Sequence, residues 1–424
     1  MKILTTRQYP KIMIYIQIAY VLVMSFFTDV LRFPNMITYV TDLINMSILV
    51  FLLINWKKMQ ETIKKSCFTV EAILVSFYFA LACFTAFFNG VKPTLFIWDM
   101  RNSFRFFVFL FACIAFLDQK DVDRIYGLLL GAHILNIAAC LYEYFVLHLV
   151  RDNVGGIFGS ELGCNNKLNV FLCVVMVYST CLFIYKKISL KILLFYLISS
   201  ILIAAVAELK VFYLELAIVL FLAVCLNLSK VRMVGFGMIG IFVLLVGLNA
   251  IKRLFPLHYE YLTNFRLMLQ YVSSEDNFGY YISRTHPFSQ IDRIFFHGNI
   301  LRNMFGYGFG NCVFSSRFDQ LTSSFYKLYG HLNYPVLTSA FVFLETGYIG
   351  TMLHLAILIY PVFYAFRSTC RYKRLRFHRD VTAFLGIIFL VIYFDCQALG
   401  WECAYLIYFC IASIVIKRKS IQKK

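Results

Sequence analysis

The chain has 424 residues, of which 61% are hydrophobic and 15% are charged, and its formal net charge is +18. A soluble globular protein carries about 45–50% apolar and about 25% charged residues, so this composition excludes a soluble enzyme and indicates an all-α integral membrane protein. Basic residues gather in the cytoplasmic loops of membrane proteins, which explains the charge, and without a nucleic-acid-binding motif we expect no nucleic-acid partner.

About twelve apolar segments are long enough to cross the roughly 30 Å hydrocarbon core of a bilayer. The first follows a basic start and ends without a small-residue cleavage site, so we expect a retained helix rather than a signal peptide. The fourth is short, and the amphipathic stretch Trp98–Phe107 extends it. The predicted spans are 12–30, 38–55, 69–88, 104–117, 126–149, 168–185, 192–207, 211–228, 233–250, 336–363, 382–397 and 401–416.

Lysine and arginine predict the orientation of these spans. With the N-terminus inside, the cytoplasmic loops and tails hold 25 of these residues, against 7 in the short outer loops. Because basic loops resist translocation, we expect both termini in the cytoplasm. Residues 1–250 then form a membrane domain of nine spans, 251–335 form one large extracytoplasmic loop between helices 9 and 10, and 336–424 form three more spans and a basic cytoplasmic tail.

Ionisable side chains inside predicted spans are costly, and they are usually paired or functional. We expect Glu143 and Glu215 to be buried, hydrogen-bonded carboxyls that hold helices together, and Glu208, Asp395 and Glu402 to lie at the interface. Cations clustered on the outer side favour an anionic lipid head group, in particular a diphosphate. The cations predicted on that side are Arg151, Lys210, Arg293 and Arg302.

The outer loop contains too many aromatic residues for a disordered tether. Residues 258–269 and 291–305 have the pattern of amphipathic helices that lie near the membrane interface. They precede Gly306-Tyr-Gly-Phe-Gly310, which follows a helix and is therefore no nucleotide-binding fingerprint. Glycines at every second position predict a tight turn and a close approach of backbone to a bulky ligand.

Four motifs occur in order over about residues 150–350. Arg151 precedes Gly155-Gly-Ile-Phe158 and Asn166, and Glu208-Leu-Lys210 opens a later span. Arg293 precedes Gly306-Tyr-Gly-Phe-Gly310, and His331-Leu-Asn333 precedes Glu345-Thr-Gly-Tyr-Ile-Gly350. In this order, around one large outer loop, the motifs resemble those of the Wzy-type polysaccharide polymerases and related O-antigen ligases of bacterial envelopes.

The resemblance implies a GT-C-like membrane glycosyltransferase in the bacterial cytoplasmic (inner) membrane. Such an enzyme passes a growing glycan from polyprenyl diphosphate to the non-reducing end of a lipid-linked repeat unit at the extracytoplasmic face. It needs no nucleotide sugar, and we expect no cofactor and no metal. The implied partners are the polyprenyl-diphosphate-linked oligosaccharide, the lipid bilayer and a chain-length regulator protein.

The same resemblance suggests roles for individual residues. Arg293 and Lys210 are predicted to stabilise the charge that grows on the departing diphosphate, and either His331 or Glu345 to act as the base for the attacking hydroxyl. The remaining predicted residues bind substrate: Arg151, Asn166, Arg302, Gly306, Tyr307, Gly308 and Gly310.

Several alternatives stay open at this point. An O-antigen ligase uses the same donor with another acceptor, and the sequence holds no readable acceptor code. A twelve-span transporter or a lipid-linked oligosaccharide flippase fits the span count, although we find no related halves. An envelope scaffold without chemistry is a third class. Whether Cys164 and Cys312, two outer cysteines, form a disulfide is open as well.

Overall fold

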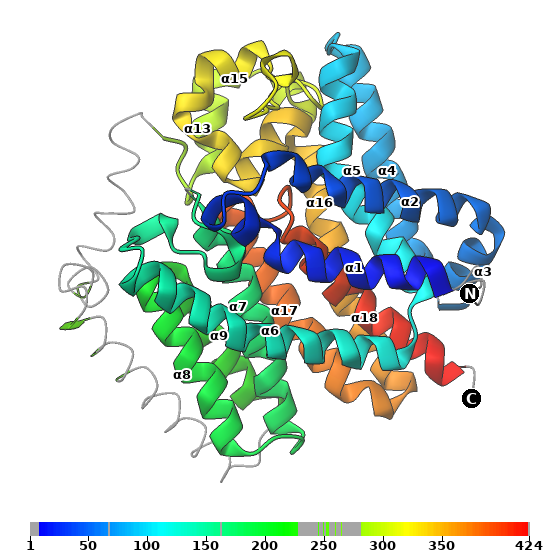
Figure 1. The fold of residues 1–424 in the computed structure, drawn as a ribbon. Coiled ribbons are helices and arrows are strands. Elements are labelled where there is room, and N and C mark those ends of the chain that lie inside the picture. Colours follow the sequence, from blue (N-terminus) through cyan, green and yellow to red (C-terminus); the bar gives the residue numbers. More distant parts are fainter. Residues whose placement is uncertain are drawn as a thin grey trace.

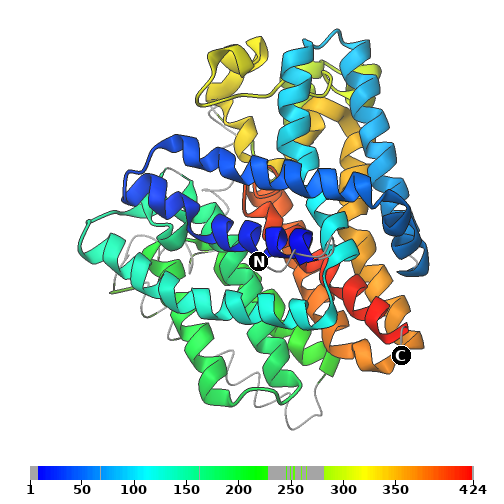
Figure 2. The same cartoon turned by 45° about the vertical axis from the view of Figure 1, so that its right-hand side comes forward.

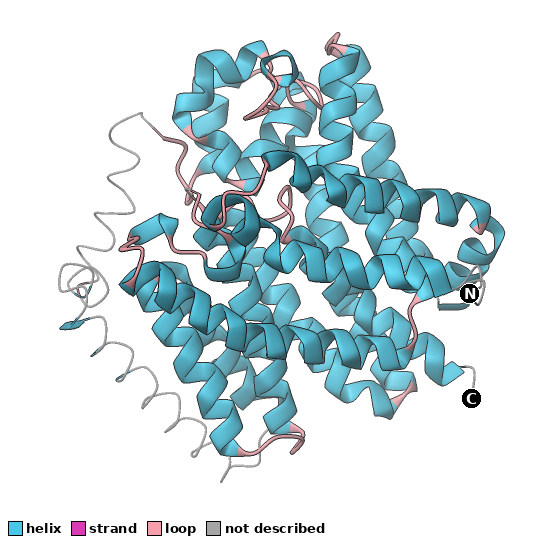
Figure 3. Cartoon of the chain, viewed as in Figure 1, coloured by secondary structure: helices cyan, strands magenta, loops and turns pink. Residues whose placement is uncertain are grey.

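The computed structural model describes residues 8–227 except 67 and 162, six single positions between 228 and 280, and residues 281–422. This part of the chain is 81% helical and contains no strand (Figure 3). Apart from four of these single positions, the predicted span 233–250 and the predicted interfacial helix 258–269 lie outside the described residues. The all-α class expected from the composition is confirmed for the described part.

Eleven of the twelve predicted spans overlap long helices of the structure. Among the described residues, seven helical segments are long and apolar enough to cross a membrane, which indicates a multi-pass membrane protein; the count of twelve stays a prediction. The long helices are α1 (Gln8–Ser25), α2 (Val40–Ile54), α4 (Thr69–Phe88), α5 (Pro93–Phe116), α6 (Gln119–Phe145), α7 (Cys164–Ile184), α8 (Leu190–Val206), α9 (Lys210–Asn227), α16 (Thr338–Arg371), α17 (Arg376–Asp395) and α18 (Ala404–Gln422).

The helices pack around α7, α17 and α18, whereas α2 and α4 lie outside them (Figures 1 and 2). Every residue of α7 from Leu168 to Cys181 is buried. On α2 and α4, by contrast, large apolar side chains such as Leu43, Phe77 and Phe87 are exposed. Exposed apolar faces of this kind suit contact with lipid, because a soluble monomer rarely tolerates them.

Segments that were predicted to share a side of the membrane contact one another. At one end, Lys11 pairs with Asp121 (2.7 Å) and Lys417 with Asp123 (2.5 Å). At the other end, the Trp98 indole donates to the Phe314 carbonyl (3.2 Å). The end of α18 lies far from the outer-loop helices α13 (Pro287–Ile291) and α15 (Ser324–Tyr329) (Figures 1 and 2). These contacts agree with the predicted alternation of loops; which end faces the cytoplasm stays a prediction.

The basic segment expected as a cytoplasmic loop forms a further helix, α3 (Trp56–Ser66). Its apolar residues Met59 and Ile63 are buried at helical spacing, while Lys57 and Lys64 stay exposed. The apolar pair is enough to hold this short helix against its neighbours, an amphipathic pattern that the charge count alone did not reveal.

The described part of the outer loop is a folded layer with its own apolar core. Phe295, Phe296 and Tyr334 pack there against Phe343 of α16. The predicted helix 291–305 is interrupted: a π-helical turn, Asp292–Phe296, ends at His297, whose φ of 52° is left-handed, and α14 (Ile300–Phe305) begins three residues later. Cys164 and Cys312 are both buried free thiols.

Candidate functional site

A cavity of about 390 Å³ opens between the membrane helices and the outer loop. Its walls come from the end of α1, from α5, from the start of α7, from α16 and from the 396–403 connection between α17 and α18. Residues 313–317 of the outer loop complete the lining. A volume of this size lies within the range of small-molecule sites.

Helix α5 contributes more polar residues to the cavity than the other helices. Pro93 starts this helix at a position where proline is favoured, since the first helical N–H groups have no partner within the helix. Polar side chains then interrupt an otherwise apolar helix, and most of them face the cavity. Those that line it are Asp99, Arg101, Asn102, Ser103 and Arg105, with Trp98 and Phe107 at either end.

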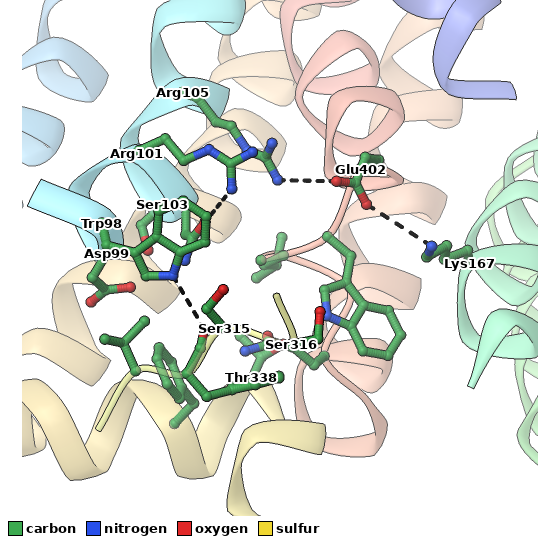
Figure 4. Close-up of a pocket in the computed structure, with 18 of the residues that line it drawn as sticks. Trp98, Asp99, Arg101, Ser103, Arg105, Lys167, Ser315, Ser316, Thr338 and Glu402 are labelled. Atoms are coloured by element: carbon green, nitrogen blue, oxygen red, sulfur yellow. Dashed lines mark hydrogen bonds and ion pairs between the residues drawn. The ribbon is translucent and has the colours of Figure 1, made fainter. Parts of the chain in front are cut away.

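Three cations of the cavity belong to one ion-pair network. The Arg101 guanidinium donates two hydrogen bonds to Asp42 of α2. Arg105 lies 3.4 Å from Asp42. It also lies 3.4 Å from Glu402, and Lys167 of α7 lies 4.0 Å from the other Glu402 oxygen (Figure 4). The Arg105 side chain is 5% exposed, yet its Nε finds no hydrogen-bond partner among the described residues. This buried guanidinium therefore keeps a free donor.

Glu402 is the shared acceptor of this network and lies between α17 and α18. Burial raises the pKa of Glu402, but the Arg105 and Lys167 cations outweigh burial and hold the pKa at about 2. At neutral pH the carboxylate is ionised and balances both cations. Glu402, predicted at the interface, thus joins α5 to α7 across the cavity.

Two buried carboxyls occupy the α5–α16 side of the cavity. Glu345, on α16, is 1% exposed, and its Oε1 accepts hydrogen bonds from the Gly310 and Cys312 N–H groups (3.1 and 3.0 Å). Asp99 is also 1% exposed, and neither of its oxygens has a hydrogen-bond partner of good geometry. The groups that face Asp99 are Glu345, the Ser103 hydroxyl and the Gly310 N–H, and none of them is a cation.

The outer-loop segment Phe314–Arg317 forms the roof of the cavity, and cation–π contacts help to hold it there. Arg317 lies over one ring, Tyr39, at 5.2 Å and donates to the Asn35 carbonyl (2.8 Å) and the Thr38 hydroxyl. Arg101 lies between Tyr39 (5.8 Å) and Trp98 (4.7 Å). Because Trp98 also holds the Phe314 carbonyl, the segment Phe314–Arg317 is fastened at two points above the cavity.

One of the predicted catalytic residues, Glu345, lines the cavity. Arg293 and His331 are exposed on the outer loop, and Lys210 is half-buried as the first residue of α9. None of these three is among the residues that line the cavity in the described part of the chain. The sequence motifs therefore bring together residues that the fold separates.

None of the predicted substrate-binding residues is among the described residues that line the cavity. Asn166 is half-buried in the first turn of α7, and its neighbour Lys167 is the residue that lines the cavity. The Arg302 guanidinium lies 4.3 Å from the ring centre of Tyr307, whose hydroxyl donates to the Phe295 carbonyl (2.7 Å). Arg151 starts a short 3₁₀ turn, and its side chain lies outside the described residues.

The glycine-rich segment 306–310 approaches protein backbone closely. The Tyr307 and Gly308 N–H groups donate to the carbonyls of Leu344 and Glu345 (2.7 and 3.0 Å). A Cβ at Gly306 would lie 2.5 Å from the Glu345 carbonyl carbon. The predicted tight turn is present, and the close partner in the structure is α16; Phe309 is the residue by which this segment lines the cavity.

Sequence reasoning missed the wall that holds the cavity's arginines. Trp98–Phe107 was interpreted only as an extension of a short span, although Asp99, Arg101 and Arg105 all fall within it. Charges inside a membrane helix were the available signal, because such residues usually face a cavity or a partner. Glu402 carried the same signal, but only the fold shows that it meets Arg105, 297 positions away.

The buried carboxyls outside the cavity behave as predicted. Glu143 Oε2 accepts from the Gly155 and Gly156 N–H groups (3.0 and 2.6 Å) and so joins α6 to the following loop. Glu215 accepts from Asn169 (3.2 Å) and from the Cys173 thiol (3.0 Å), which joins α9 to α7.

The described residues contain no cluster of three or more His, Cys, Asp or Glu side chains that would hold a metal ion. No family model matches this chain, and no curated protein is significantly similar to it in sequence.

Proposed function

We propose that this protein is a polysaccharide polymerase of the bacterial inner membrane. It transfers a growing glycan from polyprenyl diphosphate to the non-reducing end of a lipid-linked repeat unit, at the extracytoplasmic face. The observation that carries the proposal is the cavity, where arginine and lysine side chains lie beside buried carboxyls between apolar membrane helices. These two kinds of group are what a glycosyl transfer from a diphosphate requires.

The cations support the departure of the diphosphate. Negative charge grows on its oxygen as the bond to the anomeric carbon breaks, and fixed cations stabilise that charge more than the ground state. Arg105, with a free Nε and two contacts of 3.4 Å, is the cation best placed to accept a new anionic partner. Arg101 and Lys167 extend the same site on either side.

Aromatic and small polar side chains of the cavity suit a glycan. Two of the three tryptophans in the chain, Trp98 and Trp401, line the cavity and present apolar ring surface. Ser315, Ser316 and Gln397 supply hydrogen-bonding groups from the opposite elements. An oligosaccharide with alternating apolar faces and hydroxyls fits such a lining.

Transport is the second candidate, and one observation favours it. The cavity reaches His354 on α16, which is 6% exposed, stacks on Tyr78 at 5.2 Å and leaves Nδ1 without a partner among the described residues. A buried histidine inside a membrane protein is a common part of a proton-coupled transporter. A flippase would move the lipid-linked unit and leave its length unchanged.

The test uses purified protein in liposomes without nucleotide sugar or energy source. The probe is the lipid-linked oligosaccharide extracted from source cells that lack the gene for this chain. A ladder of longer glycans on a gel is the expected result. If the oligosaccharide instead moves between leaflets without growing, the polymerase proposal is wrong and transport takes its place. Adding a lipid A core acceptor separates a polymerase from a ligase.

A further inference from the structure

The buried carboxyls of the cavity differ in how they are held. Glu345 Oε1 is fixed by the Gly310 and Cys312 N–H groups, so this oxygen is an acceptor in the folded state. Neither oxygen of Asp99, by contrast, makes a hydrogen bond of good geometry among the described residues; Asp99 faces Glu345, the Ser103 hydroxyl and the Gly310 N–H, and no cation. Burying a carboxylate without a well-formed hydrogen bond or a cation beside it costs free energy, so stability alone does not explain its presence.

Asp99 and Glu345 face each other, so their two carboxylates would repel each other if both were ionised. Like charges at short range in a low-dielectric site disfavour double ionisation, so the pair holds one proton. The fixed Oε1 of Glu345 leaves Oε2 as the oxygen that carries this proton. Asp99 is then the ionised member, with its oxygens in the cavity wall.

The same helix carries the carboxylate and the cations. Asp99 precedes Arg101 by two positions and Arg105 by six, a separation of roughly 3 to 9 Å along the helix axis. Residues two apart leave a helix on different sides, and what unites these three side chains is that all of them line the cavity. A glycosyl diphosphate bound by the arginines can extend across the cavity toward Asp99, which lines the same cavity. In this arrangement the acceptor hydroxyl lies between the anomeric carbon that it attacks and the Asp99 carboxylate.

We propose that Asp99 is the general base of the glycosyl transfer and that Glu345 positions it. The inference rests on the proposed function and adds the residue that handles the acceptor. The acceptor oxygen forms the new bond to the anomeric carbon while its proton moves to an Asp99 oxygen. The bond from that carbon to the diphosphate oxygen breaks, and its electron pair stays on the diphosphate beside Arg101 and Arg105. Polyprenyl diphosphate leaves, and the proton passes from Asp99 to water.

The test compares Asp99→Asn and Glu345→Gln with wild type in the liposome assay, with the extracted lipid-linked oligosaccharide as probe. We expect the turnover of Asp99→Asn to fall about 10²-fold or more, with KM changed less than about threefold, because a base acts only on the chemical step. Its unfolding midpoint should change little, since neither Asp99 oxygen makes a hydrogen bond of good geometry among the described residues. Glu215→Gln is the matched control, a buried carboxyl outside the cavity, and should keep wild-type turnover.

A second variant keeps the proposal testable if Asp99→Asn misfolds. Asp99→Ala leaves room for a small acid, and added formate should restore part of its turnover, which a merely structural role would not allow. If wild type makes a ladder and Asp99→Asn matches Glu215→Gln, the base assignment is wrong and the polymerase stands. The same holds if formate has no effect on a folded but inactive Asp99→Ala. If wild type makes no ladder, the proposed function and this inference fail together.

Discussion

The two sides of the cavity treat charge in opposite ways. On the cation side, Arg101, Arg105 and Lys167 each have a carboxylate partner, and Glu402 serves two of them. On the carboxyl side, Asp99 has no cation beside it among the described residues and faces another acid, Glu345. A network that only stabilised the fold would pair all of these groups. The difference indicates that the cations are already held in place by carboxylates before substrate binds, whereas Asp99 is available to accept a proton from a substrate hydroxyl.

The total charge of the lining supports this comparison. Among described residues the cavity holds four cations, Arg101, Arg105, Lys167 and Arg317, and five carboxyls, Asp29, Asp99, Glu161, Glu345 and Glu402. A diphosphate can therefore bind only if some of these cations leave their carboxylate partners and contact the diphosphate oxygens instead. The 3.4 Å contacts of Arg105 are long for charge-assisted hydrogen bonds, so of the two cavity arginines that pair with carboxylates Arg105 has the looser contacts.

The largest effect is expected from removing the central cation. Arg105→Ala should lower the rate of ladder formation by about 10²–10³-fold, because it removes charge stabilisation at the leaving oxygen. Arg105→Lys keeps the charge but loses the planar fork of the guanidinium, so its rate of ladder formation should lie between those of wild type and Arg105→Ala. Initial rates in liposomes measure the change.

Arg293→Ala is the informative control for this prediction. The sequence motifs predict a severe loss, whereas its exposed position outside the cavity predicts a rate within about threefold of wild type. A severe loss in Arg293→Ala with a normal rate in Arg105→Ala would mean that the outer loop binds the diphosphate and that the cations of the cavity do not.

The second prediction disturbs the carboxyl side through its backbone. Helix α16 is broken at Gly347, whose φ of 62° and ψ of −162° suit glycine alone, and a Cβ there would lie 2.5 Å from the Met304 carbonyl oxygen. Gly347→Ala should lower the free energy of unfolding by about 3 kcal/mol and displace Glu345. Gly131→Ala in α6 meets no atom within 4 Å and should leave stability equal or higher. Equal unfolding midpoints for the two variants would contradict the strained break.

Much of the fold was predictable because membrane spans follow a one-dimensional rule. An apolar run of sufficient length forms a helix wherever it occurs, so segments such as 69–88 were predicted with their observed ends. The break at Gly347 was not, because it depends on the approach of Met304, Phe305 and Gly306 from the outer loop. Nothing local to α16 requires it.

The candidate site was less predictable because it is assembled from distant segments. Glu345 was predicted from its motif, and Asn166 was one residue away from Lys167. Arg105 and Glu402 acquire their meaning only from each other, and their separation in sequence hides the pair. Sequence motifs identify residues that are close along the chain, whereas this cavity is formed by helices that are far apart in the sequence and pack against one another.

The third prediction concerns the pH dependence of the cation side. The folded-state pKa of Glu402 is about 2, below its ordinary value of 4.5, so ionisation stabilises the folded state by about 3 kcal/mol. This contribution is complete above about pH 5 and is lost as the pH falls toward 2. Unfolding midpoints in detergent should therefore separate wild type from Glu402→Gln at about pH 7; the gap should shrink to less than half at about pH 3 and close only near about pH 2. A constant gap would mean that Glu402 is not held by its cations.

The smallest effect is expected at the roof, where the two sides meet. Arg317 is exposed and holds Tyr39, Asn35 and Thr38, contacts worth about 0.5–1 kcal/mol together at an exposed site. Arg317→Ala should therefore leave stability nearly unchanged but loosen the Phe314–Arg317 segment, raising KM about threefold to fivefold at constant turnover. Lys327→Ala breaks another exposed ion pair of the same loop, with Asp319, away from the cavity, and should change neither constant. A fall in turnover without a rise in KM would place Arg317 beside the departing diphosphate, and the cation side would then extend into the roof.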